Sequence, residues 1–317
     1  MNAEVTHPHA DRSMPPRIRV VEVGPRDGLQ NEAAEISTGD KVAFVDLLSA
    51  SGLPVVEVAA FVSPRWVPQM ADALTVFSQI TRRPGVRFAA LVPNLAGLER
   101  AREAGADEVA VFAAASETFS LRNINSSIDE SFQRYREVCR AAAAARLPVR
   151  GYLSTCFGCP YEGAVDPDRV RDLTLRLLDL GVYEVALSDT IGVAHPGQVR
   201  QILEHVLAAV PADRIALHFH DTRGTALANV LASLPFDICA FDASAGGLGG
   251  CPYAPGAAGN LATEDLVYML DGLGVETGVR LPAVIDASSY IAARLEHELP
   301  SRVYQAARRS SAGRRRQ

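Results

Sequence analysis

The sequence of 317 residues contains no apolar run of the roughly 20 residues that a helix needs to cross a lipid bilayer. Its N-terminal segment, residues 1–16, lacks the apolar stretch of a secretory signal, and Glu4 and Asp11 argue against a transit peptide. The formal net charge of −6 disfavours nucleic acid as the main partner. We therefore expect a cytoplasmic protein that begins with a disordered arm and binds neither membranes nor nucleic acids.

Lysine and cysteine are also scarce. Lys41 is the single lysine and stands at the start of an expected helix, which argues against an enzyme that forms a Schiff base through a lysine at a strand end. Five cysteines are an odd number in a long chain, so no disulfide framework is expected. Cys156 and Cys159 form one CxxC motif without a second pair, and we expect two reduced thiols there.

What the chain does contain is a series of short β-rich runs that alternate with helical patterns. The expected strands are residues 18–24, 54–61, 86–92, 108–113, 149–153, 184–187, 215–219 and 237–243. The expected helices are residues 39–50, 70–80, 95–103, 128–146 (after a long polar loop), 166–180, 196–210, 222–234 and 262–273. Eight such units in one continuous domain predict a (β/α)8 TIM barrel, which we place at residues 17–300.

The barrel is expected to carry extra C-terminal helices. Residues beyond about 281 predict one or two helices, and residues 301–317 predict the end of a helix followed by a basic, solvated tail. An open, doubly wound sheet is the structural alternative. It would favour a GxGxxG turn after the first strand, and the segment Gly24-Pro25-Arg26-Asp27-Gly28 does not match that pattern.

Two segments in the second half of the chain carry candidate chemical groups. Residues 246–260 are rich in glycine and proline, which is typical of a functional lid or binding loop, and they include Cys251 and Asn260. His218 and His220 are separated by one residue in an apolar run. In a strand both side chains point to the same side, so both imidazoles can bind one ion.

The segment 21–32, VEVGPRDGLQNE, the histidine pair and the glycine-rich loop together resemble 3-hydroxy-3-methylglutaryl-CoA lyase. That family belongs to the metal-dependent TIM-barrel lyases that cleave carbon–carbon bonds. The resemblance extends from about residue 18 to about residue 278 and keeps the family's motif order. It implies an acyl-CoA substrate and a divalent metal, and we further expect a homo-oligomer, most simply a dimer.

The active site of a TIM barrel lies at the C-terminal ends of its strands, and polar residues collect there in this sequence. Arg26 and Asp27 end the first expected strand, Glu57 lies in the second, and Asp189 and Thr190 end the sixth. Asp27 is the best anionic metal ligand, and it joins His218 and His220. The resemblance makes Asn260 the fourth protein ligand, although from local sequence alone it could instead cap a helix. This ligand set suits Mg²⁺ or Mn²⁺.

Cleavage of a β-hydroxy thioester requires removal of the hydroxyl proton, stabilisation of the departing enolate, and protonation of that enolate. Asp27 or His218 could take the proton. Arg26 could stabilise charge on the thioester oxygen, with Glu57 orienting Arg26 or a metal ligand. Cys251 could deliver a proton or shield the intermediate. Asp189 and Thr190 are expected to contact the substrate or to support the residues that do.

The first functional hypothesis is a lyase that cuts 3-hydroxy-3-methylglutaryl-CoA into acetyl-CoA and acetoacetate, as in leucine degradation. The second is a relative acting on a longer branched 3-hydroxyglutaryl-CoA, because Ala59, Ala60 and residues 185–188 are less polar than the family pattern. A condensing acyl-CoA synthase of the same superfamily is a third, but little chain remains after the barrel to supply the additional regions of such enzymes. A non-catalytic module that binds metal or CoA is the fourth.

Overall fold

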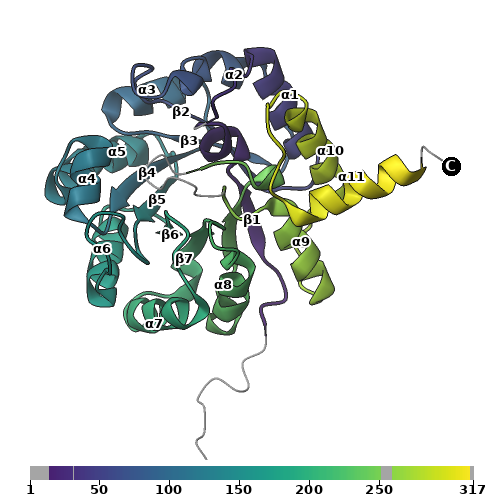
Figure 1. The fold of residues 1–317 in the computed structure, drawn as a ribbon. Coiled ribbons are helices and arrows are strands. Elements are labelled where there is room, and N and C mark those ends of the chain that lie inside the picture. The colour runs from purple at the N-terminus through teal and green to yellow at the C-terminus, as the bar shows by residue number, and fades with distance from the viewer. Residues whose placement is uncertain (1–13, 31, 251–258, 315–317) are drawn as a thin grey trace, which may run out of the picture.

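The structure is a computed structural model that describes residues 14–30, 32–250 and 259–314. Eight parallel strands close a barrel in chain order, and helices surround it (Figure 1). The first strand pairs with the last, with Arg19 opposite Ala240 and Glu22 opposite Ala243. The predicted TIM barrel is therefore confirmed. Its strands are β1 Arg19–Glu22, β2 Val55–Ala60, β3 Arg87–Leu91, β4 Glu108–Ala114, β5 Val149–Ser154, β6 Val185–Asp189, β7 Ile215–Phe219 and β8 Ala240–Ala243.

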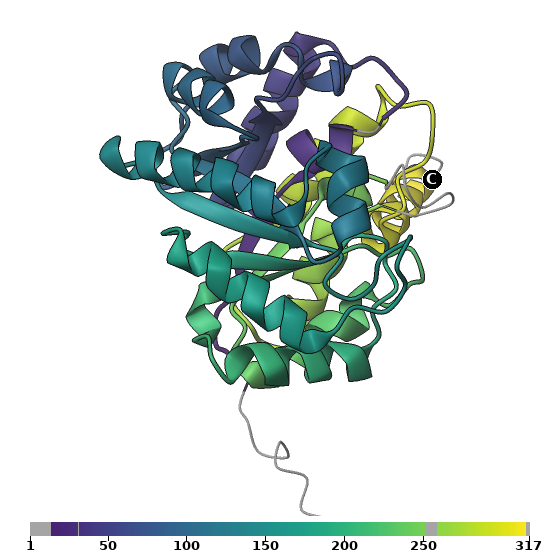
Figure 2. The same cartoon turned by 90° about the vertical axis from the view of Figure 1, so that its left-hand side faces the viewer.

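The helices cover the outside of the strands, as the side view shows (Figure 2). They are α1 Thr38–Ser49, α2 Ala73–Gln79, α3 Leu95–Glu103, α4 Glu117–Ile124, α5 Ile128–Ala144, α6 Pro167–Asp179, α7 Pro196–Leu207, α8 Ala226–Ser233, α9 Thr263–Gly272, α10 Leu281–Ala292 and α11 Arg302–Arg314. Short 3₁₀ turns are η2 Pro68–Met70, η3 Ala212–Arg214, η4 Leu234–Phe236 and η5 Ala245–Gly247, and η1 Gly24–Gly28 is a π-helical turn. None of the helices in the described residues is long and apolar enough to span a membrane.

Helix α4 corrects the prediction of a long polar loop before residue 128. Ser116 caps its first turn by accepting a hydrogen bond from the amide of Phe119, and Asn125 ends it in the left-handed conformation. Phe119 is buried on its inner side. The segment is short and polar and was therefore predicted as a loop. The sequence signals for a helix were the apolar Phe119 and the two capping residues, Ser116 and Asn125.

Three expected boundaries were also wrong for local reasons. The first strand ends at Glu22, because the amides of Asp27 and Gly28 both donate to the carbonyl of Val23 and close the turn η1. The eighth strand begins at Ala240 rather than at residue 237, since Asp237 is left-handed after η4. Helix α2 begins at Ala73, because Pro68 starts the separate turn η2.

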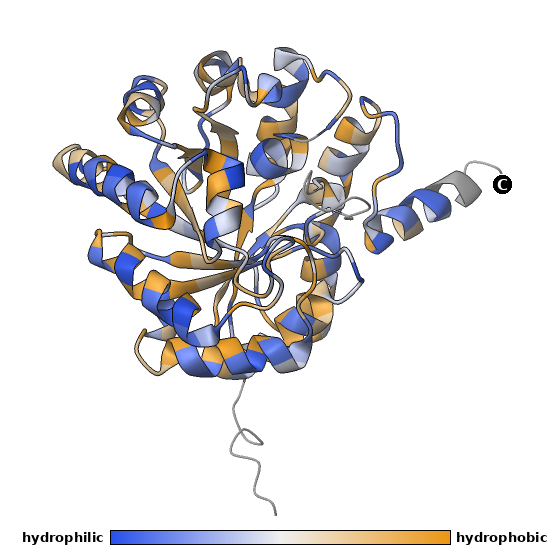
Figure 3. Cartoon of the chain, turned by 60° about the vertical axis from the view of Figure 1, so that its left-hand side comes forward, coloured by the Kyte–Doolittle hydropathy of each residue, from blue (hydrophilic) through white to orange (hydrophobic). Residues whose placement is uncertain are grey.

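Apolar side chains fill the layer between strands and helices, where Figure 3 shows hydrophobic colour on the strands and on one side of many helices. Helix α11 is docked onto this body and begins where the end of a helix, followed by a basic tail, was expected. The carboxylate of Asp265 in α9 accepts hydrogen bonds from Ser301 Oγ and from the amides of Arg302 and Val303. Tyr304 is buried behind this cap. The C-terminal helix therefore packs against α9.

We predict that Gly52→Ala destabilises the protein more than Gly85→Ala. Both glycines have positive φ, +96° and +82°, so each substitution should cost about 1 kcal/mol of unfolding free energy or more. A Cβ at Gly52 would also lie 2.3 Å from the carbonyl oxygen of Gly278, whereas Gly85 has nothing within 4 Å. Urea unfolding of both variants measures the difference, and equal losses would contradict the predicted backbone clash.

Candidate active site

The C-terminal ends of the strands surround a cavity of about 680 Å³. Its lining includes Arg26, Asp27, Thr190, His218 and His220. These residues come from separate parts of the sequence and meet because parallel strands bring their carboxyl ends to one side of the barrel. The location agrees with the prediction made from strand order.

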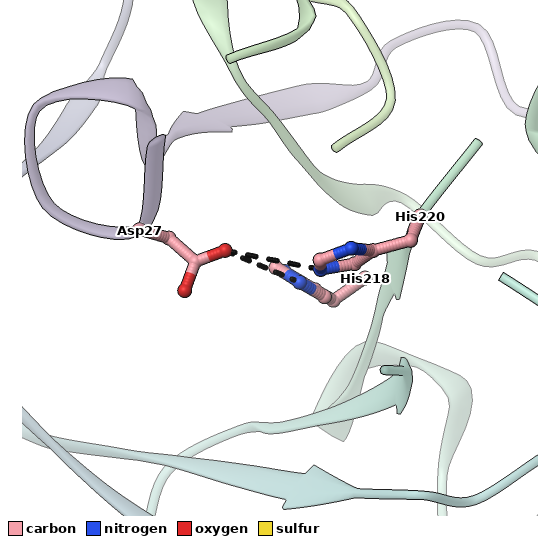
Figure 4. Close-up of side chains that lie close together, drawn as sticks. All are labelled: Asp27, His218 and His220. Carbon is pink, nitrogen blue, oxygen red and sulfur yellow. Dashed lines mark ion pairs between the residues drawn. The ribbon is translucent and has the colours of Figure 1, made fainter. Parts of the chain in front are cut away.

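Asp27, His218 and His220 form a compact group (Figure 4). Their candidate ligand atoms all lie within 4.8 Å of one another. Asp27 Oδ2 lies 3.9 Å from His218 Nε2 and 3.8 Å from His220 Nε2. His218 lies in β7 and His220 directly follows it, so the alternation of a strand turns both rings towards the cavity.

Asn260 joins this group from the far side of the glycine-rich loop. Its backbone forms an isolated bridge with His220, and its Nδ2 donates to Asp27 Oδ2 at 2.9 Å and to the carbonyl of Leu248 at 3.0 Å. Its Oδ1 is buried and has no partner among the described residues. The alternative role as a helix cap is wrong, because α9 starts at Thr263 with Ala262 in the capping position.

These four residues fit a divalent cation. They supply a carboxylate, two imidazoles and an amide oxygen, and the amide oxygen lacks any other partner in the described part of the chain. Burial and the neighbouring charge of His218 lower the pKa of His220 to about 4, so this imidazole is neutral near pH 7 and keeps a lone pair for a metal. Oxygen and imidazole ligands of this kind suit Mg²⁺ or Mn²⁺.

Arg26 lies between two carboxylates. Its Nε donates to Glu57 Oε1 at 2.7 Å, and its Nη1 donates to Asp27 Oδ1 at 2.5 Å. Burial works to raise the pKa of Asp27, but the charge of Arg26, with smaller contributions from the histidines in their protonated form and from the hydrogen bond of Asn260, outweighs it and holds that pKa below its ordinary value. Glu57 lies where the pairing of β2 with β3 shifts register, an irregularity that can re-aim side chains beside active sites. The expected contact between Glu57 and Arg26 is present.

The turn that holds Arg26 and Asp27 is fixed by Glu22, which the sequence analysis did not single out. Its carboxylate accepts from the amides of Gly24 and Ala245 at 2.8 Å and from Thr263 Oγ1 at 2.7 Å. Burial raises the pKa of Glu22 to about 7, against the lowering effect of these bonds. One side chain thereby links η1, the start of the glycine-rich loop and α9.

A second group missed from the sequence lies deeper in the barrel. Tyr152 donates its hydroxyl hydrogen bond to Glu57, and Arg150 Nη1 donates to the Tyr152 oxygen at 3.0 Å. Arg150 also pairs with Asp242, whose Oδ2 lies 3.1 Å from His218 Nδ1. Positions 150 and 152 share one face of β5, and Asp242 is a charge inside an apolar strand. These two patterns were the available signals.

The remaining predicted residues lie in different surroundings. Asp189 accepts from the amides of Val193 and Ala194, both at 2.9 Å, and does not line the cavity. Burial raises the pKa of Asp189 to about 6. Thr190 does line the cavity and accepts from the amide of Thr155. Cys251 falls outside the described residues. Cys156 and Cys159 are buried free thiols, as expected.

Comparisons with known proteins agree with this geometry. A family model described as HMGL-like matches residues 17–291. The chain is 54% identical to the 3-hydroxy-3-isohexenylglutaryl-CoA/hydroxy-methylglutaryl-CoA lyase of Pseudomonas aeruginosa over 294 residues, covering 93% of this chain and 98% of that protein. It is 52% identical to the mitochondrial hydroxymethylglutaryl-CoA lyase of Bos taurus over 294 residues, covering 93% of this chain and 90% of the relative.

A solved structure shows the same relationship in three dimensions. The crystal structure of hydroxymethylglutaryl-CoA lyase from Pseudomonas aeruginosa matches with a TM-score of 0.92 and 53% identity, covering 94% of this chain and 99% of the other. Family model, sequence identity and fold extend over nearly the whole described barrel. The resemblance inferred from the sequence is confirmed, and the chain belongs to the HMGL-like family.

Proposed function

We propose that this protein is a lyase that cleaves 3-hydroxy-3-methylglutaryl-CoA into acetyl-CoA and acetoacetate. The observation that carries the proposal is the group of Asp27, His218, His220 and Asn260 beside Arg26 in one cavity. The names of the relatives support the same reaction. We further propose that the reaction belongs to leucine degradation and takes place in the cytoplasm in a homodimer.

The four-residue group is proposed to hold Mg²⁺ or Mn²⁺. Asp27 of this group is also the end of a connected network of three arginines and four carboxylates, which runs through Tyr152 and consists of Arg19, Arg26, Arg150, Asp27, Glu57, Glu184 and Asp242. When bound, such an ion lowers the pKa of a hydroxyl that coordinates it.

The side chains of the chain itself divide the remaining work. Of the two candidate bases, we assign removal of the substrate's hydroxyl proton to Asp27, because Nε2 of His218 faces the same space and is proposed to bind the metal. Arg26 stays charged and is held by Glu57 and by the face of Tyr152, 5.4 Å from its guanidinium carbon. It is placed to stabilise negative charge that develops on the thioester oxygen during cleavage.

Protonation of the departing enolate is assigned to Cys251. The supporting observation is that Gly250, its chain neighbour, lines the cavity. Thr190 is assigned a contact with the substrate. Of the two roles expected for Asp189, its bonds to Val193 and Ala194 favour support of the loop after β6.

The rest of the cavity suits an acyl-CoA. Arg122 and Arg134 line it and offer guanidinium groups for the phosphates of CoA, and the exposed Trp66 offers a ring for stacking. The longer branched substrate is not favoured by the lining of the cavity. Ala59 and Ala60 are buried and do not line it, and Ser188, which does, supplies a hydroxyl group.

The direct test is an assay with the purified full chain. The protein is incubated with Mg²⁺ or Mn²⁺ and a panel of 3-hydroxy-3-alkylglutaryl-CoA thioesters, and products are identified by mass. We expect acetyl-CoA and acetoacetate from the 3-methyl thioester, and no products after treatment with EDTA. Turnover confined to longer 3-alkyl groups, or unaffected by EDTA, would contradict the proposal.

We predict that His220→Ala weakens Mn²⁺ binding about 10–100-fold, a usual cost of disturbing a metal site. The imidazole of His220 faces Asp27, and its backbone pairs with Asn260. Calorimetric titration of Mn²⁺ measures the change. His205→Ala is the matched control, since His205 lies exposed on α7 and pairs with Asp168. Equal Mn²⁺ affinity in the two variants would remove His220 from the site.

We predict that Arg26→Gln lowers kcat about 10²–10³-fold with a much smaller change in KM, because loss of one donor to developing charge acts mainly in the transition state. Steady-state kinetics at saturating metal separate the two constants. A variant with normal kcat and raised KM would show that Arg26 only binds substrate. Mn²⁺ titration of the same variant checks that the site still holds metal.

A further inference from the structure

Arg150 occupies the interior of the barrel, and its side chain is only 2% exposed. Its Nη2 donates to Asp242 Oδ1 at 2.8 Å and its Nη1 to Asp242 Oδ2 at 3.2 Å. Its Nε donates to Glu184 at 2.7 Å. The guanidinium therefore places an N–H group against each oxygen of the Asp242 carboxylate.

Within the residues that the structure describes, the carboxylate of Asp242 has one further hydrogen-bonding partner. His218 Nδ1 lies 3.1 Å from the same Oδ2 atom that receives Arg150 Nη1. A carboxylate paired with an arginine in this way has no proton to donate, so the proton in the contact with His218 must lie on Nδ1. The opposite nitrogen of His218, Nε2, is the atom that faces Asp27.

We propose that Asp242 is a positioning residue that fixes the ring and the tautomer of His218, with Nδ1–H held by Asp242 and Nε2 left free towards the metal group. Arg150 holds Asp242 in the orientation this requires. The assignment rests on the metal site of the proposed function. It explains why the charges of Arg150 and Asp242 are buried between β5 and β8, although neither side chain itself lines the cavity.

The geometry predicts what Asp242→Asn would do. An amide has one acceptor oxygen and one donor nitrogen, whereas both oxygens of Asp242 now accept from Arg150. The new NH₂ group must face Arg150 Nη2 or lie between Arg150 Nη1 and His218. The second arrangement offers His218 Nδ1 a donor and favours the tautomer with its proton on Nε2, where a metal cannot then bind.

Glu184→Gln is the matched control. It also removes one carboxylate oxygen from Arg150, but at Nε, on the side of Arg19 and away from His218. Because each variant breaks a buried pair with the same arginine, both should lose stability. Only Asp242→Asn should alter His218. General loss of packing is thereby separated from a specific effect on the imidazole.

The experiment uses the full chain with ¹⁵N-labelled histidine, metal-free and with Mg²⁺, in wild type and both variants. NMR spectra that correlate ring nitrogens with ring protons report the tautomer, and His218→Gln identifies the signals. We expect Nδ1–H for His218 in wild type and in Glu184→Gln. In Asp242→Asn we expect Nδ1–H to give way in part or whole to Nε2–H, and an Mn²⁺ affinity about 10–100-fold weaker, with the Glu184→Gln affinity unchanged. A folded Asp242→Asn variant that keeps Nδ1–H alone would contradict the assignment.

Two further results would overturn the assignment. One is a wild-type spectrum with the His218 proton on Nε2, a measurement that stands even if Asp242→Asn does not fold. The other is an equal loss of Mn²⁺ affinity in both variants. The outcome is independent of the lyase assay: a protein that shows the expected tautomer and Mn²⁺ binding without lyase turnover would refute the proposed function alone.

Discussion

The burial of charge inside the barrel constrains the rest of this structure. Arg150 and Asp242 lie where most side chains of a TIM barrel are apolar, and an isolated charge there would cost several kcal/mol. Each is acceptable because the other is present in a forked pair, with Tyr152 and Glu184 completing the contacts. The strands that supply these residues must keep their register, since a shift by one residue would point each charge at the helices.

Buried hydrogen bonds to carboxylates also hold the side chains of the cavity in place. The carboxylate of Glu57 accepts hydrogen bonds from Arg26 and from Tyr152. It therefore connects the guanidinium group in the cavity to the buried network inside the barrel. The carboxylate of Glu22 joins the turn η1 to Ala245 and Thr263, which lie before and after the glycine-rich loop. The groups of the site are thus held by bonds within the protein, which is the arrangement that electrostatic catalysis requires.

Much of this could be predicted from the sequence, and the limits have physical causes. The alternation of strands and helices is local, so the barrel and most of its elements were recognisable. His218 and His220 share a strand face, and Asp27 stands in a long motif. The contacts of Asp242 with Arg150 and of Glu22 with Thr263 join residues that are 92 and 241 positions apart, and only the closed barrel shows them. For Asn260, the local sequence allowed a helix cap, whereas the structure places its side chain against the distant Asp27.

The pair of Arg150 and Asp242 also has a consequence for how the chain folds. Strands β5 and β6 can bring Arg150 to Glu184 early, but its second carboxylate is synthesised 92 residues later, in the last strand. In a barrel that lacks its last strand, Arg150 would be paired with Glu184 but not with Asp242. Contacts between residues so far apart in the sequence form slowly. Strand β8 therefore completes the hydrogen-bonded closure with β1 and the charge balance of the interior in one event. Assembly of this barrel should be cooperative to its last strand, with no stable half-barrel on the way.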